Sequence, residues 1–286
     1  MRDFNENTIT DAVIARFADT PDPRLRQIAE SLVRHLHDFV RDIEPTIEEW
    51  DYAIGFLTRT GHLSDDKRQE FILLSDTLGV SMLVDAINHR MPNGATETTV
   101  LGPFYVENPP ERANGADIAG DAPGEKLHFS GMVTNPDGAP ITGAWVDVWQ
   151  SDEDGYYDVQ KPGDEPSLRA RFRTDGGGRF NLWSIVPKFY PIPADGTVGQ
   201  MLAATRRHPY RPAHIHFMIG AEGYETLVTH LFIKDDPYLD SDAVFGVKAS
   251  LIVDLARHEG GTAPDGRAMT GAWASHSHRF GLKPKG

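Results

Sequence analysis

The sequence contains histidine pairs of the form His-x-His, a spacing that can hold a metal ion where both rings face the same way. In a strand, residues i and i+2 point to one face, whereas in a helix they point about 200° apart. Only the segment 213–219 around His214 and His216 alternates in the manner of a strand. We therefore expect these two imidazoles to converge on one metal.

The other two pairs have ordinary interpretations. His35 and His37 fall in an amphipathic helical stretch, so their rings diverge and we expect them at a solvated surface. His276 and His278 lie near the C-terminus in a serine-rich stretch without apolar alternation, which favours a polar tail. Neither pair is expected to bind a metal.

Tyrosines near the candidate strand offer a second kind of ligand. Tyr190 lies in the proline-flanked stretch 187–193, and Tyr156 and Tyr157 directly follow an apolar strand pattern at 146–150. A histidine pair with a third histidine or a carboxylate would suit zinc. A tyrosine phenolate is a hard anionic oxygen donor, better matched to ferric iron. The residues alone leave open whether these tyrosines bind a metal or pack in the core.

Composition excludes several kinds of chemistry. The chain of 286 residues has no cysteine, so disulfides, thiolate metal sites and a cysteine nucleophile are excluded. The formal net charge is −14 and the basic residues form no run, which argues against nucleic acid as a partner. No apolar run reaches the roughly 18 residues of a membrane span. The expectation is a protein that is soluble, cytoplasmic and not membrane-embedded.

The periodicity of the sequence changes along the chain. Apolar residues from Ile28 to Ile43 recur with a helical period, Pro45 ends that stretch, and Thr46 to Glu49 fits a capping box. A region rich in proline and glycine, 103–124, then leads to short alternating segments separated by turn residues. The sequence predicts an α+β protein, with a helical domain over residues 1–105 and an antiparallel β-sandwich over residues 106–286.

Several motifs in order make the chain resemble the intradiol ring-cleaving dioxygenases, the non-haem iron(III) enzymes of the catechol 1,2-dioxygenase family. The resemblance covers roughly residues 20–255. The matching segments are Leu101–Tyr105, Val146–Gln150 with Asp154–Tyr157, Arg171–Asp175 with Gly178–Phe180, Pro187–Pro193 and Arg211–His216.

The resemblance implies an Fe(III) cofactor and a set of site residues. The ligands carried over are Tyr157, Tyr190, His214 and His216, with Tyr157 chosen over Tyr156 because the family pattern after the strand is Gly-x-Tyr. Tyr190 would also take a proton from the substrate. Arg211 would stabilise the anion that develops on the ring during reaction.

Within the family, the chain resembles the subgroup that cleaves hydroxyquinol (1,2,4-trihydroxybenzene) with O₂. Asp85 is assigned to the position where catechol-specific members carry a proline, and a carboxylate there could accept a hydrogen bond from the third hydroxyl. His230 stands where catechol enzymes usually have a glutamine, so it either supports the ligands or packs in the core. The implied substrate-binding residues are Met82, Asp85, Val100, Leu101, Gly102, Pro103, Arg211 and Val244.

Other readings remain open at this stage. A catechol or chlorocatechol dioxygenase would keep the fold and the iron, a zinc hydrolase would use the histidine pair alone, and a β-sandwich ligand-binding module would have no catalysis. The amphipathic helix around Ile28 to Ile43 cannot bury its apolar stripe alone, which favours a homodimer. The resemblance likewise implies dimerisation through the helical region, and a lipid in the interface.

Overall fold

The computed structural model describes residues 2–65, 68–163 and 165–286 and has an α+β fold. By its internal contacts the chain divides into two compact units, Met1–Arg59 and Thr60–Gly286. This division differs from the expected boundary at residue 105, because the helices of residues 70–88 pack with the sheet-bearing unit. One of them, α4 (Glu70–Thr77), contacts α6 (Thr197–Ala204) directly.

The first unit holds α1 (Ile9–Ala15), α2 (Pro23–Ile43) and most of α3 (Ile47–His62). Helix α2 begins where the Asp22 carboxylate accepts hydrogen bonds from the first turn, and Pro23 suits that turn because it has no N–H to satisfy. The predicted capping box is confirmed at the start of α3, where Thr46 and Glu49 exchange side-chain to main-chain hydrogen bonds of 2.8 and 3.2 Å.

In the second unit, short helices accompany the sheets. Helix α5 (Val80–Asn88) follows α4 after Gly79, whose φ of 74° favours glycine. The buried Glu70 of α4 accepts a hydrogen bond of 3.0 Å from the Val198 N–H at the start of α6. Two 3₁₀ turns complete the helical elements: η1 (Asp158–Gln160) and η2 (Ala249–Leu251).

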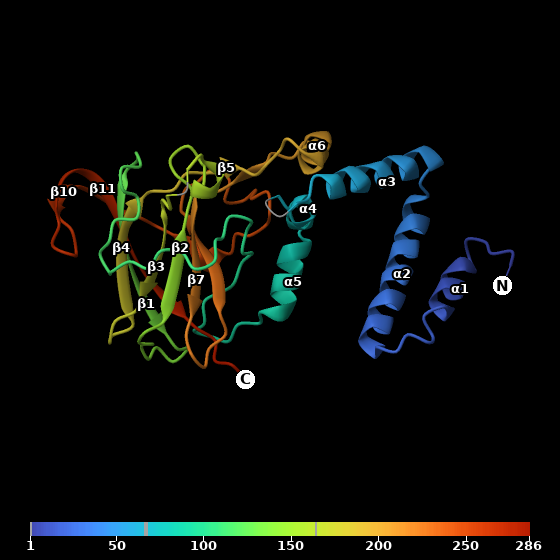
Figure 1. Ribbon diagram of the computed structural model, residues 1–286, viewed down its shortest axis with the longest axis horizontal. Helices are drawn as coiled ribbons and strands as arrows, with labels where there is room; N and C mark the ends of the chain where they lie inside the picture. The colour runs from blue at the N-terminus through green and yellow to red at the C-terminus, as the bar shows by residue number, and fades with distance from the viewer. Residues whose placement is uncertain (1, 66–67, 164) are drawn as a thin grey trace. The chain divides into compact units, whose positions relative to one another are not determined.

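The strands form two large sheets and one small one (Figure 1). The four-stranded sheet has the order β10 (Ala256–Thr262), β11 (Ala268–Gly281), β1 (Lys126–Thr134) and β4 (Arg179–Ile185). The five-stranded sheet has the order β3 (Arg169–Arg173), β2 (Trp145–Trp149), β7 (His214–Gly220), β8 (Leu227–Ile233) and β9 (Ile252–Val253). The small sheet pairs β5 (Tyr190–Pro191) with β6 (Tyr210–Arg211).

The large sheets are mixed, which corrects the expectation of an antiparallel sandwich. β1 pairs with β11 in parallel, and so does β8 with β9. Parallel neighbours need a crossover rather than a hairpin, and short-range turn signals cannot reveal such pairings. His276 and His278 lie in β11 and not in a polar tail, because pairing with β1 and β10 organises a stretch that lacks alternation.

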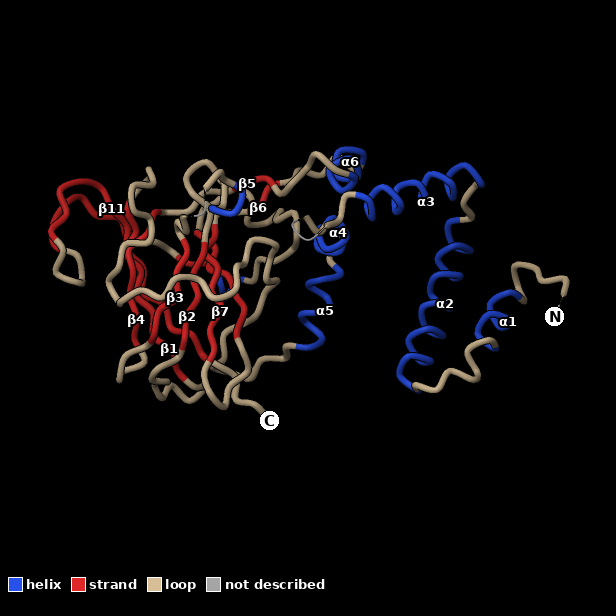
Figure 2. Tube along the Cα trace, viewed as in Figure 1, coloured by secondary structure: helices blue, strands red, loops and turns tan. Residues whose placement is uncertain are grey.

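Aromatic residues from both large sheets pack between them and form the core. Phe129 of β1 lies 5.0 Å, ring centre to ring centre, from Phe217 of β7, and Phe217 lies 4.8 Å from Phe280 of β11. All three side chains are buried. This face-to-face packing makes the unit a sandwich, and Figure 2 shows its helices α4, α5 and α6 to one side of the strands.

Candidate metal and substrate site

Two tyrosines and two histidines place their polar atoms together at one end of the sandwich. The Tyr157 hydroxyl lies 2.8 Å from Nε2 of His216, 3.4 Å from Nε2 of His214 and 3.2 Å from the Tyr190 hydroxyl. The two Nε2 atoms are 3.1 Å apart. These are the four residues that the sequence analysis assigned to the metal, and the structure brings all of them together.

Strand geometry explains the position of the histidines. His214 and His216 alternate with Ile215 on β7, so both rings leave the same face of the sheet. Trp149, the partner of His216 on β2, stacks on the His216 ring at 4.6 Å and holds its orientation. The Nδ1 of His214 donates to the Pro212 carbonyl at 2.7 Å, which leaves the Nε2 lone pair free to face the tyrosines.

The tyrosines come from two connections between strands. Tyr190 is held in β5, where it pairs with Arg211 of β6. Tyr157 directly precedes η1 and is fully buried, whereas Tyr156 is 54% exposed. The structure explains why the Gly-x-Tyr pattern begins with glycine. Gly155 has a φ of 85°, and a Cβ there would lie 2.6 Å from the Tyr190 Cβ.

Burial sets the protonation of this cluster. Burial, followed by the charge of Arg211, lowers the pKa of His214 to about 3, and burial together with His230 lowers the pKa of His216 well below its usual value. Burial also raises the pKa values of Tyr157 and Tyr190. The imidazoles are therefore neutral, as metal ligation requires, while the phenols would lose their protons only to a nearby cation.

The donor set fits a metal ion. Two phenol oxygens and two imidazole nitrogens face one another at 2.8 to 3.4 Å, and groups of these two kinds bind transition-metal ions in proteins. His230 is a further neighbour: a ligand nitrogen of each of His214, His216 and His230 lies within 4.8 Å of the others, and all three are buried. A three-histidine set would omit both tyrosines, although their hydroxyls point into the same cluster.

Arg211 brings a fixed positive charge beside the cluster. Its side chain is buried and paired with Asp242, with Nε 3.1 Å from Oδ1 and Nη2 3.3 Å from Oδ2. Its Nη1 lies 3.3 Å from Nε2 of His214. The pair with Asp242 holds the guanidinium in one orientation, so its charge is directed before any ligand arrives.

A small cavity borders the cluster, shares Tyr190 with it and is also lined by Arg211. Its polar lining includes Asp76 at the end of α4. Six residues expected to bind substrate or react with it line this cavity: Val100, Gly102, Pro103, Tyr190, Arg211 and Val244. The remaining lining residues are Leu73, Asp76, Phe104, Ile192 and Pro193.

Three residues expected in the pocket, all within the described ranges, lie outside this lining: Met82, Asp85 and Leu101. The Asp85 carboxylate instead lies 2.8 Å from Nδ1 of His89 and 3.2 Å from Nζ of Lys248. In this structure the Asp85 carboxylate is engaged by His89 and Lys248, and its role toward the substrate stays a prediction. Asp76 is the carboxyl that the cavity contains.

Asp76 could have been found from helical spacing. Leu73 and Asp76 are three residues apart in α4 and so lie on one helix face, and both line the cavity. Burial raises the pKa of the Asp76 carboxyl. A buried carboxyl in a cavity with an arginine and a tyrosine is a typical feature of a functional site.

Comparisons with known proteins agree with this geometry. Residues 100–274 match the family described as "Dioxygenase", and residues 22–96 match "Catechol dioxygenase N terminus". The chain is 56% identical to a 6-chlorohydroxyquinol 1,2-dioxygenase of Cupriavidus pinatubonensis, covering 92% of this chain and 95% of the relative. It is 52% identical to a hydroxyquinol 1,2-dioxygenase of a Rhizobium species, covering 98% and 96%.

Solved structures of intradiol dioxygenases have the same fold. A hydroxyquinol 1,2-dioxygenase from Pseudomonas putida DLL-E4 superimposes with a TM-score of 0.92 at 50% identity, covering 98% of this chain and 99% of that one. A catechol 1,2-dioxygenase from Pseudomonas arvilla C-1 superimposes with a TM-score of 0.82 at 29% identity, covering 96% and 91%. In the described part of the chain no helix has the length and apolar character needed to cross a bilayer, and the cytoplasmic location stays a prediction.

Proposed function

Because the chain belongs to the intradiol ring-cleaving dioxygenase family, we propose that it cleaves the ring of hydroxyquinol (1,2,4-trihydroxybenzene) between adjacent hydroxyls. Both atoms of O₂ enter the product, 3-hydroxy-cis,cis-muconate, which is the enol form of maleylacetate. The observation that carries this proposal is the buried cluster of Tyr157, Tyr190, His214 and His216 beside a cavity that holds Arg211 and Asp76.

We propose Fe(III) as the cofactor of this cluster. Two phenolates and two neutral imidazoles form a hard donor set of charge −2, which suits a trivalent iron better than zinc. When bound, the iron would act as a Lewis acid that binds the substrate diol and withdraws electron density from its ring. This would make the ring reactive toward O₂. A zinc hydrolase would have no use for two phenolic donors, and a simple binding module would have no use for a buried arginine directed at the cavity.

The protein's own groups then divide the remaining tasks. Tyr190 lines the cavity, and as a phenolate it would take a proton from a substrate hydroxyl and hold it at Oη. The Arg211 guanidinium stabilises negative charge that develops on the ring, since Asp242 holds it in place. The apolar lining, which includes Leu73, Ile192 and Val244, limits the access of water.

Asp76 is proposed to select the third hydroxyl, the role that the sequence analysis assigned to Asp85. Its carboxyl is 5% exposed, lines the cavity with Arg211 and Tyr190, and can hydrogen-bond to a ring hydroxyl that catechol lacks. A cavity that buries such a group discriminates against a ring without the hydroxyl, because the carboxyl then lacks that hydrogen bond and keeps only the one with Ser81.

Visible absorption spectroscopy tests the iron and the substrate together. Tyrosinate ligands to Fe(III) give a charge-transfer band, so we expect a coloured protein whose band shifts when hydroxyquinol is added without O₂. A colourless protein after iron loading would overturn the dioxygenase proposal. A band that shifts with catechol and not with hydroxyquinol would overturn only the substrate.

A pair of carboxylate variants tests the specificity residue. We expect Asp76→Asn to lower kcat/KM for hydroxyquinol relative to catechol by about tenfold, the value of one buried hydrogen bond. Asp85→Asn is the matched control, since Asp85 is paired with His89 and Lys248, and it should leave this ratio unchanged. The reverse pattern would restore the role to Asp85.

A ring-chlorinated hydroxyquinol is a second candidate substrate. The relative of 56% identity is named for 6-chlorohydroxyquinol, and the apolar Val244 in the cavity wall could contact a ring substituent. Steady-state comparison of hydroxyquinol with its 6-chloro derivative decides between the two, because the preferred substrate is the one with the higher kcat/KM.

We further propose that the protein is a homodimer formed through its N-terminal helices, with lipid bound in the interface. Helix α2 exposes an apolar stripe along its length: Leu25, Ile28, Leu32, Leu36, Phe39, Val40 and Ile43 are each 43–62% exposed. A stripe of this kind on a 21-residue helix needs an apolar partner, and a second copy of the same helix provides one.

A further inference from the structure

The loop 242–246 contributes Val244 to the wall of the cavity. Hydrogen bonds from the main-chain N–H groups of this loop hold it in place. The Asp242 carboxylate accepts hydrogen bonds from the N–H groups of Val244 at 3.3 Å and Gly246 at 2.9 Å, besides those from Arg211. The Ala243 N–H donates to the Tyr210 carbonyl at 3.1 Å. The position of Val244 in the cavity therefore depends on how this loop is anchored.

Another part of the cavity wall is formed by the last turn of α4. Asp76 lines the cavity there, and Thr77 is the final residue of the helix. The carbonyl groups of a last helical turn have no partner within the helix, so they need donors from elsewhere. The group that donates to the Thr77 carbonyl therefore determines how the end of α4 is held relative to the loop.

Arg207 supplies the donor and joins the two walls. Its Nη1 donates to the Thr77 carbonyl at 2.7 Å, and its Nη2 donates to the Ala243 carbonyl at 3.2 Å. These carbonyls belong to residues 130 and 36 positions away in the chain. One planar guanidinium thus fixes the distance between two segments that the sequence separates.

The same side chain also supports a strained residue. Phe245 has a φ of 58°, a conformation that bulky side chains rarely adopt, and it is 53% exposed. The Arg207 guanidinium lies 5.2 Å from the centre of its ring. Since Phe245 follows Val244, this contact holds the loop in its strained form.

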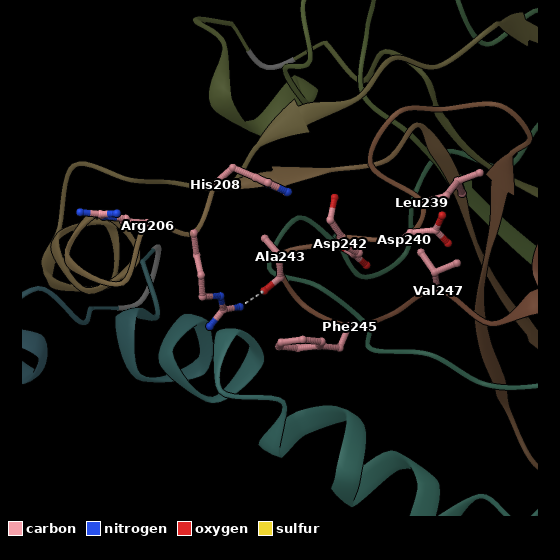
Figure 3. A pocket seen from close by; sticks show the side chains of 10 residues that line it. Arg206, His208, Leu239, Asp240, Asp242, Ala243, Phe245 and Val247 are labelled. Carbon is pink, nitrogen blue, oxygen red and sulfur yellow. Dashed lines mark hydrogen bonds between the residues drawn. The ribbon is translucent and has the colours of Figure 1, made fainter.

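Arg207 lines a second cavity, of about 480 Å³, together with Ala243 and Phe245 of the loop, and is not among the residues that line the substrate cavity. In Figure 3 the dashed line ends at the Ala243 carbonyl, and Arg206 lies apart from the loop. Because Arg207 does not line the substrate cavity, it can affect the substrate only through the end of α4 and the loop 242–246, to which it is hydrogen-bonded.

We propose that Arg207 is a positioning residue that sets substrate specificity by holding Asp76 and Val244 at a fixed separation across the cavity. This inference rests on the proposed function, since it concerns the discrimination between a triol and a diol. Without Arg207, the end of α4 and the loop separate, and the carboxyl no longer meets the third hydroxyl. Arg211 keeps its own pair with Asp242, so the chemical step is affected less than binding.

The test compares neighbouring arginines. Arg206 precedes Arg207, is exposed and, among the described residues, forms no side-chain hydrogen bond or ion pair, so Arg206→Ala is the matched control. We expect Arg207→Ala to raise KM for hydroxyquinol about 10-fold with little change in kcat, within the ~10²-fold that a small misplacement can cost. The ratio of kcat/KM for hydroxyquinol to that for catechol should fall by a similar factor.

A double variant separates positioning from general damage. If Arg207 acts by placing Asp76, Arg207→Ala combined with Asp76→Asn should lose no more triol preference than Asp76→Asn alone. Arg207→Lys, which can reach one carbonyl at a time, should lie between wild type and Arg207→Ala. It also serves if the alanine variant does not fold.

The outcomes decide the inference. Equal effects of Arg206→Ala and Arg207→Ala, an unchanged triol-to-catechol ratio in Arg207→Ala and Arg207→Lys, or additive losses in the double variant would each overturn it. The visible band, which should survive in every variant, and the wild-type activity report separately on the proposed function. A wild-type protein without band or ring cleavage refutes that function rather than the role of Arg207.

Discussion

The two units of the molecule depart in opposite ways from the rule that apolar residues are buried and polar ones exposed, because one buries a group of polar side chains and the other exposes a row of apolar ones. In the sheet-bearing unit, polar groups such as His214, His216 and Arg211 are at most 3% exposed and surrounded by aromatic side chains. In the helical unit, apolar residues such as Leu32 and Phe39 are 62% and 56% exposed.

This difference in burial indicates what each unit binds. Burying polar groups costs free energy unless they are satisfied, so a chain that collects them at one point indicates a site built for a bound ligand. Exposing a long apolar stripe is likewise unfavourable, and it indicates a surface that another molecule covers. We therefore expect the sheet-bearing unit to bind the proposed cofactor and substrate, and the helical unit to bind a second copy of the chain.

The largest effect should follow from removing one buried ligand. We expect His216→Ala to lose the visible band and all measurable ring cleavage, because the remaining donors no longer surround a metal. His276→Ala is the control, as His276 belongs to a His-x-His pair on a strand but lies outside the tyrosine–histidine cluster. Metal analysis with oxygen uptake measures both, and an active His216→Ala protein would refute the ligand assignment.

Arg211→Lys should have the next largest effect. A lysine cannot keep both contacts with Asp242 and also direct its charge at the cavity. Loss of such a charge typically lowers kcat by about 10²–10³-fold, while the visible band should remain. Stopped-flow kinetics under O₂ measures it, and an unchanged kcat would limit Arg211 to a structural role.

The exposed stripe predicts a change in association rather than in chemistry. Leu32→Asp with Leu36→Asp places two charges in the apolar surface of α2, so we expect dimers to dissociate into monomers in sedimentation equilibrium. Gln27→Asp adds charge on another face of the same helix and should leave the dimer intact. If the double variant sediments as a dimer, the interface lies elsewhere.

The smallest effect is a loss of stability in acid, which should differ between a buried carboxylate and one at the surface. Burial alone would raise the pKa of Asp242, but Arg211 lowers it below the ordinary 3.8. A lowered pKa contributes stability above the unfolded pKa that is lost as pH falls through the folded value. The loss of thermal stability in Asp242→Asn should therefore be largest at neutral pH and shrink in acid.

The counterpart on the surface of α2 is the half-buried Glu30, whose pKa Arg26 lowers through a hydrogen bond. Water and salt screen this pair, so Glu30→Gln should change the melting temperature little at any pH. A pH-independent loss in Asp242→Asn would show that its pairing with Arg211 does not control acid stability.

Much of the site could be predicted from local patterns. The His-x-His alternation on a strand, the Gly-x-Tyr segment and the proline-flanked Tyr190 each specify their geometry within a few residues, and the structure brings their polar atoms within 3.4 Å. The helical period of residues 28–43 predicted α2 equally well. Such features depend on near neighbours in the chain, and these are what a sequence displays.

Contacts between distant segments were decided only by the tertiary structure. Periodicity could not reveal that β11 returns parallel to β1, nor that Asp76 rather than Asp85 lines the cavity. Both aspartates lie in short helices, and Asp85 pairs with Lys248, which lies far along the chain. The sequence by itself determined the strand that carries His214 and His216 and the helix with an apolar stripe, and the resemblance of its motifs to the family added the two tyrosines as candidate ligands. Which distant side chains meet follows from packing the whole chain, because burial and charge pairing act through space.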